Sequence, residues 1–216
     1  MVNVSGIPPN MLMVTSICKK TTQAINYFAR KKEGQINKMK AIKLIYLADR
    51  YHLRKYGRPV IGDAYWAMKL GPVGSYTLNV ANLSEENLDR ECLRYAREYL
   101  GHPKNDSKNQ EMLSKKEVDM ETFSQTDIEA FERIYQEFGD KDQFELARVI
   151  THGYPEWSKF RKDIESGKTR RARMDYMDFF KNPTESGSSV FDVDEEHLNL
   201  SKEAFLENQK VAELLK

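Results

Sequence analysis

Cysteine is scarce in this chain, and long apolar runs are missing. Two of the 216 residues are cysteines, Cys18 and Cys92. They lack the close spacing of a metal-binding pair, and each falls on the apolar face of an expected helix. We therefore expect two small buried thiols in a reducing compartment rather than a zinc site. Because no apolar run approaches the roughly 20 residues that span a bilayer, we also expect no membrane partner.

A strong charge of one sign and a secretory leader are also lacking. The formal net charge is +1, which excludes a globally basic nucleic-acid-binding protein and leaves only local basic patches. Residues 2–14 have no basic start and contain a glycine and two prolines, so we expect no secretory signal and a cytoplasmic protein. The 40% hydrophobic content is enough for a real core.

Nucleotide-binding and cofactor-binding motifs are absent as well. The run Gly71-Pro72-Val73-Gly74 lacks the lysine and serine of a Walker motif and the three glycines of a dinucleotide-binding turn. We interpret it as a rigid turn. No cofactor and no metal ion are expected.

The most informative stretch is residues 36–73, which predicts a helix, a turn and a strand. Residues at three- and four-residue spacing define one helical face: Met39, Ile42, Ile45, Asp49, His52 and Tyr56. Asn37 is the expected N-cap, Gly57 suits a left-handed C-terminal position, and Pro59 blocks continuation of the helix. In the strand 63–69, Trp66 should face one way and Tyr65 the other.

The rest of the chain predicts more helix than strand. Further helices are expected at 16–33, 84–100, 124–138, 142–150 and 172–180, with short strands within 110–121 and a last helix after Ser201. Ser124 with Asp127 forms a variant capping box, and Asp142 is expected to cap the next helix. The predicted fold is α+β, mostly α-helical with a small β-sheet. Its expected core contains Leu44, Leu47, Trp66, Phe131 and Phe138.

Asp49 and His52 are the first candidates for chemistry. At positions i and i+3 of a helix their side chains can meet, and such a pair suits a general base or a metal site. His152 could complete an Asp-His-His site in space. A structural role at the edge of the core is the favoured interpretation, because no nucleophile lies nearby in the sequence.

One set of aromatic residues and two clusters of basic residues each have a structural and a binding interpretation. The aromatic residues Trp66, Trp157, Tyr46, Tyr51 and Tyr56 are expected in the core, with a partner-binding surface as the alternative. The basic clusters are Lys31, Lys32, Lys38, Lys40 and Lys43, and then Lys168, Arg170, Arg171 and Arg173. We interpret both as solvated helix faces, with a grip on phosphates as the alternative.

The residue order between positions 43 and 73 resembles a known family. A helix K-L-x-Y-L-A-D-x-x-H-L, then Y-G-R-P, G-D-x-Y-x-A and G-P-V, is similar to the Panacea (SocA-like, phage-associated GepA-like) antitoxin domain. The residues that carry the resemblance in the first block are Lys43, Leu44, Tyr46, Leu47, Ala48, Asp49, His52, Leu53, Tyr56 to Pro59, Gly62, Asp63, Tyr65, Ala67 and Gly71 to Val73. A weaker second match is Thr151-His152-Gly153 followed by Trp157.

The resemblance implies a Panacea-like domain over residues 16–181, preceded by a lead (1–15) and followed by a linker and a charged extension (182–216). It implies structural roles for the motif residues Asp49, His52, Tyr56, Gly57, Pro59, Gly62, Asp63, Gly71, Pro72, His152 and Trp157. The implied function is non-enzymatic: an antitoxin that binds and neutralises a cognate protein toxin. The toxin is expected to inhibit translation, for instance as an alarmone-synthetase-like enzyme.

The extension offers a partner-binding surface of its own. Its candidate residues are Asp192, Asp194, Glu195, Glu196, Phe205 and Leu206. An acidic, tethered helix suits docking on a basic partner surface, with an ordinary packed C-terminal helix as the alternative. Three other functions stay open at this point. They are an adaptor that delivers a toxin to a protease through its chaperone subunit, a metal-dependent hydrolase built on Asp49, His52 and His152, and a DNA-binding autorepressor. Nucleic acid is a weak expectation as a partner, since no recognition motif accompanies the basic clusters.

Overall fold

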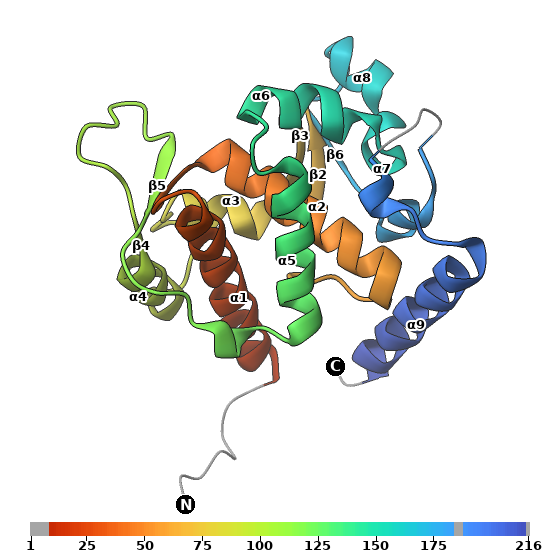
Figure 1. The fold of residues 1–216 in the computed structure, drawn as a ribbon, viewed down its shortest axis with the longest axis horizontal. Helices are drawn as coiled ribbons and strands as arrows, with labels where there is room; N and C mark the ends of the chain where they lie inside the picture. Colours follow the sequence, from red (N-terminus) through yellow and green to blue (C-terminus); the bar gives the residue numbers. More distant parts are fainter. Residues whose placement is uncertain (1–8, 184–187, 215–216) are drawn as a thin grey trace, which may run out of the picture.

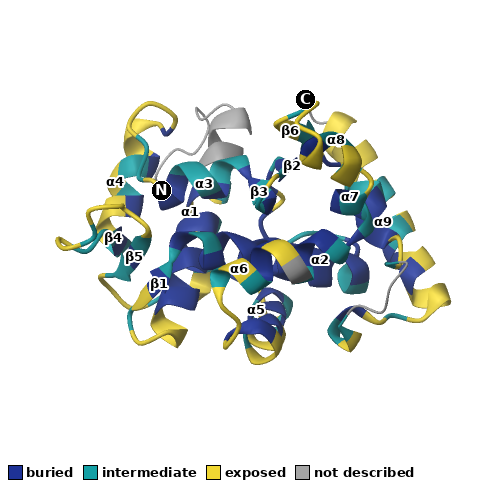
Figure 2. Ribbon diagram, turned by 90° about the horizontal axis from the view of Figure 1, so that it is seen from above, coloured by how far each residue is buried: buried dark blue, intermediate teal, exposed yellow. Residues whose placement is uncertain are grey.

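Helix α2 (Lys38–Tyr56) runs through the middle of the fold, and the other elements surround it (Figures 1 and 2). The computed structural model describes residues 9–183 and 188–214. Every residue of α2 from Lys40 to Arg54 is buried, because other elements pack on all sides of the helix. Asn37 caps its first turn by accepting hydrogen bonds from two backbone amides, and Gly57 ends it with a φ of 67°. Both predicted helix boundaries are confirmed.

Several helices pack around α2. The main ones are α1 (Pro9–Lys31), α3 (Ser75–Ala81), α5 (Gln125–Phe138) and α9 (Glu195–Leu214). Helix α4 (Arg90–Tyr99) packs on α1 instead. Shorter segments are α6 (Gln143–Glu145), a π-helical turn (Leu146–Ile150), α7 (Pro155–Ser158) and α8 (Arg161–Glu165). The 3₁₀ turns are η1 (Met120–Thr122), η3 (Thr151–Gly153), η4 (Tyr176–Phe180) and η5 (Ser189–Phe191).

The strands form two small antiparallel sheets within the described residues. One has the order β1-β5-β4, from β1 (Gln35–Asn37), β5 (Glu111–Ser114) and β4 (Leu100–Gly101). The other has the order β3-β2-β6, from β3 (Gly71–Gly74), β2 (Tyr65–Met68) and β6 (Arg171–Arg173). This mostly helical architecture confirms the predicted α+β fold class.

The segment 71–74 corrects the prediction of a rigid turn. The chain reverses at Lys69 and Leu70, and residues 71–74 continue as strand β3 beside β2. Proline is tolerated there because β3 is an edge strand. The predicted alternation in β2 is present, but Tyr65 and Ala67 point into the core while Trp66 stays half-exposed. Trp66 was therefore wrongly assigned to the core. The other four predicted core residues are buried.

Three predicted helices have different limits. Helix α1 already begins at Pro9, and residues 1–8 of the expected lead lie outside the described part of the chain. Helix α4 begins at Arg90 rather than Ser84, since the Asp89 carboxylate accepts a hydrogen bond from the Cys92 amide and caps it. The expected helix at 172–180 is instead strand β6 followed by 3₁₀ turn η4, because Ala172 and Arg173 pair with β2. The Ser124–Asp127 capping box and the Asp142 cap are confirmed.

The two cysteines also correct an expectation. Cys18 of α1 and Cys92 of α4 form a disulfide, with Cα atoms 5.7 Å apart. Each does lie on a buried helix face, as expected, but the two faces pack against each other and bring the sulfur atoms together. A disulfide needs Cα atoms at about this separation. The interpretation as two separate thiols is therefore wrong for this structure.

The C-terminal segment packs on the rest of the fold through its aromatic residues. Phe191 stacks on Phe138 of α5, and Phe205 of α9 lies between Tyr176 and Phe180. Helix α9 begins at Glu195, earlier than the predicted start after Ser201. The end of α9 does not take part in this packing, as Leu214 is 86% exposed.

Candidate functional site

The buried carboxylate of Asp49 holds the loop between α2 and β2. One carboxylate oxygen accepts a hydrogen bond from the Ile61 amide at 2.7 Å. The other accepts from the Gly62 amide at 3.0 Å and from the Tyr65 hydroxyl at 2.9 Å. Burial raises the pKa of Asp49 to about 6, an effect that these three donors oppose. Asp49 is thus fully occupied in shaping the loop.

His52 is bound to a different set of partners. Its Nδ1 lies 2.7 Å from the carbonyl oxygen of Arg58, and its Nε2 lies 3.0 Å from the Thr126 hydroxyl and 3.3 Å from an Asp127 oxygen. Burial lowers the pKa of His52 to about 4, so the neutral ring donates from Nδ1 and accepts at Nε2. The predicted Asp49–His52 pair does not form, because the loop after α2 supplies each side chain with its own backbone partner.

His152 lies apart from both and stacks on Trp157. The two rings are nearly parallel with centroids 3.5 Å apart, and the Trp157 indole donates a hydrogen bond to the Met68 carbonyl at 3.0 Å. Burial lowers the pKa of His152 to about 4, and its Nε2 is buried without a hydrogen-bond partner. In residues 9–183 and 188–214 no three His, Cys, Asp or Glu side chains are grouped to hold a metal ion. The Asp49, His52 and His152 metal site is therefore wrong.

Asp63 fixes the start of α3. Its carboxylate accepts hydrogen bonds from the amides of Tyr76 and Thr77, at 2.9 and 2.7 Å, and from the Thr77 hydroxyl at 2.7 Å. The Tyr176 hydroxyl donates to the Asp63 carbonyl. Asp63 therefore links the strand β2, helix α3 and turn η4.

The remaining motif residues also make contacts within the fold. The Tyr56 hydroxyl donates to Glu129 at 2.7 Å, and Pro59 packs against Gly62. Gly57 allows α9 to approach α2, since a Cβ atom there would lie 2.5 Å from the Ser201 carbonyl oxygen. Gly62 has a φ of 76°, a left-handed conformation that favours glycine.

Two buried arginines of α2 bind later parts of the chain, Arg50 helix α7 and Arg54 the segments around η4 and η5. Arg50 pairs with the fully buried Glu156 at 2.6 Å. Arg54 donates to the carbonyls of Phe179 and Phe191, at 2.9 and 3.1 Å, and to the Asn182 side chain at 2.6 Å. The segment after residue 182 is therefore held by the hydrogen bond from Arg54 to the Phe191 carbonyl as well as by aromatic packing.

The acidic candidates of this segment lie on the surface. Asp192, Asp194, Glu195 and Glu196 are all exposed. Phe205 is buried and Leu206 is half-buried, so Phe205 serves the packing of α9 in this structure. Asp194 also accepts a hydrogen bond from the His197 amide and so caps α9.

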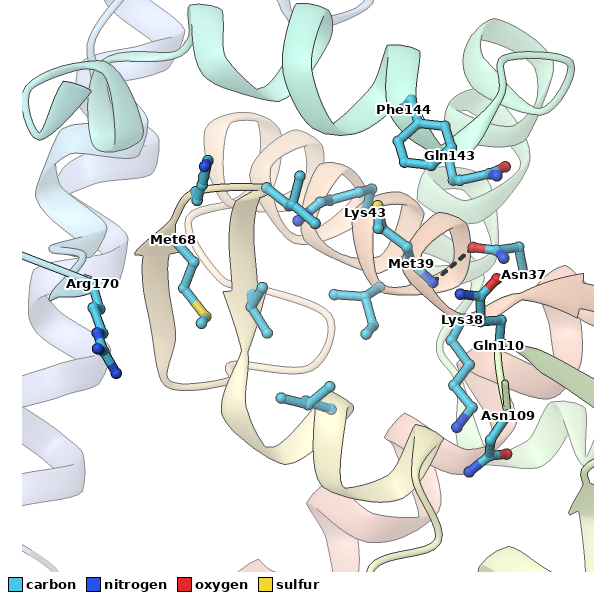
Figure 3. Close-up of a pocket in the computed structure, with 15 residues that line it drawn as sticks. Asn37, Lys38, Met39, Lys43, Met68, Asn109, Gln110, Gln143, Phe144 and Arg170 are labelled. Carbon is cyan, nitrogen blue, oxygen red and sulfur yellow. Dashed lines mark hydrogen bonds between the residues drawn. The ribbon is translucent and has the colours of Figure 1, made fainter. Parts of the chain in front are cut away.

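A groove of about 530 Å³ opens beside the N-terminal half of α2 (Figure 3). Its apolar lining comes from α2, the β2–β3 hairpin, α3 and α6, through Met39, Ile42, Met68, Leu70, Val73, Leu78 and Phe144. Its charged lining consists of Lys38, Lys43, Lys69 and Arg170, and its other polar residues are Asn37, Asn109, Gln110 and Gln143. The lining thus contains cations and no carboxylate. The volume is in the range of ordinary ligand sites.

Lys43 lies at the inner wall of this groove, on α2. Its side chain is 1% exposed, and its ammonium donates a hydrogen bond to the Pro72 carbonyl oxygen at 2.6 Å. Burial lowers the pKa of Lys43 to about 7. Gly71, with a φ of 87°, lies against it, and a Cβ atom there would come within 3.3 Å of the Lys43 side chain and 2.9 Å of the Ala147 carbonyl oxygen. Gly71 and Pro72 thus bring the edge strand close to the buried lysine.

The first basic cluster corrects its interpretation as a solvated helix face. Lys31 and Lys32 are exposed, but Lys38, Lys40 and Lys43 are buried. Lys40 donates to the carbonyl of Gly139, and Lys38 donates to the Asn82 side chain at 3.1 Å. These lysines therefore connect the start of α2 to its neighbours. Their spacing was visible in the sequence, but the elements that cover them come from distant parts of the chain.

The second basic cluster lies on and beside strand β6 rather than on a helix. Arg171 and Arg173 are exposed and lie over the Trp66 ring, with guanidinium carbons 4.7 and 5.7 Å from its centroid. They occupy the same face of the sheet as Trp66 and Met68, their cross-strand partners. This aromatic and basic face adjoins the groove, to which Met68 and Arg170 both contribute.

Fold and site together define a mostly helical α+β domain with a cation-lined apolar groove. The model of one family, the antitoxin SocA-like Panacea domain, matches residues 42–158, which is more than half of the chain. The chain therefore belongs to the SocA-like Panacea antitoxin family. The match is shorter than residues 16–181, over which the Panacea-like domain was expected to extend. It includes residues 84–100, where a helix was expected. No curated protein and no solved structure matches the chain. No helix in the described residues is long and apolar enough to cross a bilayer.

Proposed function

We propose that this protein is an antitoxin that neutralises a cognate protein toxin by binding it directly. The family match over residues 42–158 carries this proposal. The cation-lined groove supports it, because an open, mostly apolar hollow suits contact with another protein. The expected toxin class is a translation inhibitor, such as an alarmone-synthetase-like enzyme.

A non-enzymatic role is part of the proposal. Three titratable residues of the family motif already have partners within the fold: Asp49 and Asp63 accept hydrogen bonds from backbone amides, and His52 binds Arg58 and Thr126. Because Asp49, Asp63 and His52 do not line the groove, they are suited to shaping the domain rather than to turnover. A cytoplasmic location belongs to the same proposal, because the expected toxin acts on the translation apparatus.

Co-expression of the toxin and this protein tests the proposal. The tagged protein is purified from its native host, and the stoichiometric partner is expressed alone and together with it. We expect growth arrest with the partner alone, rescue on co-expression, and a stable complex in size-exclusion chromatography. A partner that is harmless alone would contradict the antitoxin function.

The same experiment separates neutralisation from proteolytic delivery, the adaptor function that stays open for this family. Direct inhibition predicts that the toxin accumulates in the complex at an undiminished level. Delivery predicts that the toxin disappears when both proteins are present, and that a protease chaperone subunit co-purifies.

A further inference from the structure

The groove beside α2 contains a cation whose hydrogen-bonding capacity is not used within the fold. The Lys43 ammonium has three donors and makes one hydrogen bond, to the Pro72 carbonyl, although its side chain is 1% exposed. Burial of a charged group is costly unless its partners are supplied. A hydrogen-bond acceptor that enters the groove can supply the missing partners of Lys43.

The charge of the lining sets the sign of the occupant. Lys38, Lys43, Lys69 and Arg170 line the groove, and its lining has no Asp or Glu. Lys69 and Arg170 are exposed, while Lys38 and Lys43 are buried. An anion therefore meets one uncompensated buried cation inside and two exposed cations outside.

The apolar lining indicates that the occupant also has apolar side chains. Met39, Leu78 and Phe144 come from three different helices and face the same hollow. Phe144 is 50% exposed within this lining, and aromatic side chains are enriched at protein–protein interfaces. Figure 3 shows Arg170 at one end of the hollow and Lys38 and Asn109 at the other.

We propose that this groove binds a segment of the toxin in which a carboxylate, directed at Lys43, is flanked by apolar side chains that cover Met39 and Phe144. This assignment rests on the proposed antitoxin function and names the surface and the partner chemistry. A nucleic-acid backbone fits less well, because it needs exposed cations along a polar track. Here the walls are mostly apolar and two of the four cations are buried.

Two groove variants test the assignment with the purified toxin as the probe. Phe144→Asp places a carboxylate in the groove, and the double variant Lys69→Glu/Arg170→Glu reverses the charge of its exposed cations. Both alter exposed side chains, so the fold is expected to stay intact in both. We expect the Kd for the toxin to rise about tenfold or more in each, as hot-spot residues of an interface do.

Matched controls lie on α9, away from the groove. Val211 is 54% exposed, similar to Phe144, and Val211→Asp introduces the same carboxylate. Lys210→Glu reverses an exposed cation of the same helix. Both controls should bind toxin with the wild-type Kd. The thermal unfolding midpoint of each variant is recorded beside its Kd, so that lost folding is not mistaken for lost contact.

A crosslink identifies the occupant. A photoreactive phenylalanine analogue at position 144 should join the chain to one toxin segment that contains Asp or Glu beside apolar residues. Wild-type Kd values for both groove variants, or a crosslink to a basic segment, would overturn the assignment and leave the antitoxin function intact. The assignment would also be overturned, in favour of nucleic acid, if the wild type bound bulk tRNA more tightly than the toxin and the groove variants lost this tRNA binding. Absence of any toxic partner would overturn the proposed function itself, and the assignment with it.

Discussion

The Lys43 ammonium donates a hydrogen bond to the Pro72 carbonyl at 2.6 Å, which ties the N-terminal half of α2 to the edge strand β3. Helix and strand meet closely there because Gly71 has no side chain to separate them. As a result, the Lys43 cation is buried with a single hydrogen-bond partner. Such a residue destabilises a domain unless a ligand uses it.

Replacing Lys43 by methionine should stabilise the isolated protein. Methionine has a similar volume and no charge to desolvate, so the free energy of unfolding at pH 7 should rise by about 1 to 3 kcal/mol. Toxin binding should weaken in the same variant. Urea unfolding and a binding titration measure the two effects. A variant that is both less stable and fully active would contradict this role of Lys43.

The gain from Lys43→Met should depend on pH. Burial lowers the pKa of Lys43 to about 7 from its ordinary value of 10.5. Between these values the unfolded chain binds more protons than the folded protein, so wild-type stability rises with pH. The difference between variant and wild type should therefore shrink from pH 7 to pH 10. A constant difference over this range would contradict the lowered pKa.

Asp49 should be among the most sensitive positions of the fold. In Asp49→Ala, the amides of Ile61 and Gly62 and the Tyr65 hydroxyl lose their acceptor inside the protein. Each unsatisfied buried donor costs about 1 to 3 kcal/mol, so a loss of at least about 3 kcal/mol in the free energy of unfolding is expected. Asp49→Asn keeps one acceptor oxygen and should lose less. Equal stability of the alanine variant and the wild type would contradict the loop-anchoring role.

Mild acid should destabilise the protein through its buried histidines. Burial lowers the pKa values of His52 and His152 to about 4, below the ordinary 6.5. Between these values the unfolded chain binds more protons, so stability falls with falling pH, by up to about 1.4 kcal/mol per pH unit for each histidine. The raised pKa of Asp49 acts in the opposite direction below pH 6.

His152→Asn isolates one of these contributions. It should flatten the dependence of the urea midpoint on pH between 6.5 and 5, where His152 would otherwise take up a proton on unfolding. His52→Asn should do the same. An unchanged slope in both variants would show that neither ring is held neutral by burial.

The Cys18–Cys92 disulfide should contribute to stability only under oxidising conditions. It joins residues 74 positions apart, and removal of such a crosslink costs about 2 to 4 kcal/mol. Cys92→Ala should therefore unfold at lower urea than the oxidised wild type and at nearly the same urea as the wild type in reductant. Intact mass after alkylation reports which state occurs in the native host. Alkylation of both cysteines in protein taken from an oxidising medium would contradict the bond.

The sequence predicted the local features of the fold well where one short segment contains the whole signal. Asn37 and Gly57 bound α2, and the Ser124–Asp127 capping box starts α5, because caps act within a single turn. Predictions failed where distant segments decide the outcome. Strand β6 forms because β2 is available to pair with it, and the Cys18–Cys92 bond forms because α1 packs on α4.

The site was less predictable than the fold. The motif residues stand out in the sequence as a group, but their partners in the fold do not. The Asp49–His52 pair looked plausible at i and i+3, yet backbone amides of the following loop compete for Asp49. The groove residues Met39, Leu78 and Phe144 carry no local signal, since they meet only through the tertiary fold. The two basic clusters did point to this region, since Lys38 and Lys43 of the first and Arg170 of the second line the groove.

The rival surface for partner binding, the acidic segment at 192–196, has its own test. Removing the chain after residue 182 would also remove the Phe191 carbonyl that Arg54 binds and the Phe205 ring that contacts Tyr176, so a truncation would confuse unfolding with lost contact. Neutralising Asp192, Asp194, Glu195 and Glu196 to their amides leaves the packing of α9 in place. The asparagine at 194 can still cap the helix.

The most direct test of the antitoxin account is rescue of growth. Cells express the co-purifying toxin together with the wild type, Phe144→Asp, the control Val211→Asp or the amide variant of the acidic segment. Full rescue by the wild type, the control and the amide variant, with rescue lost in Phe144→Asp at an equal protein level, is the predicted result. If the wild type fails to restore growth while it is present at a level above that of the toxin, this protein is not the antitoxin of that toxin.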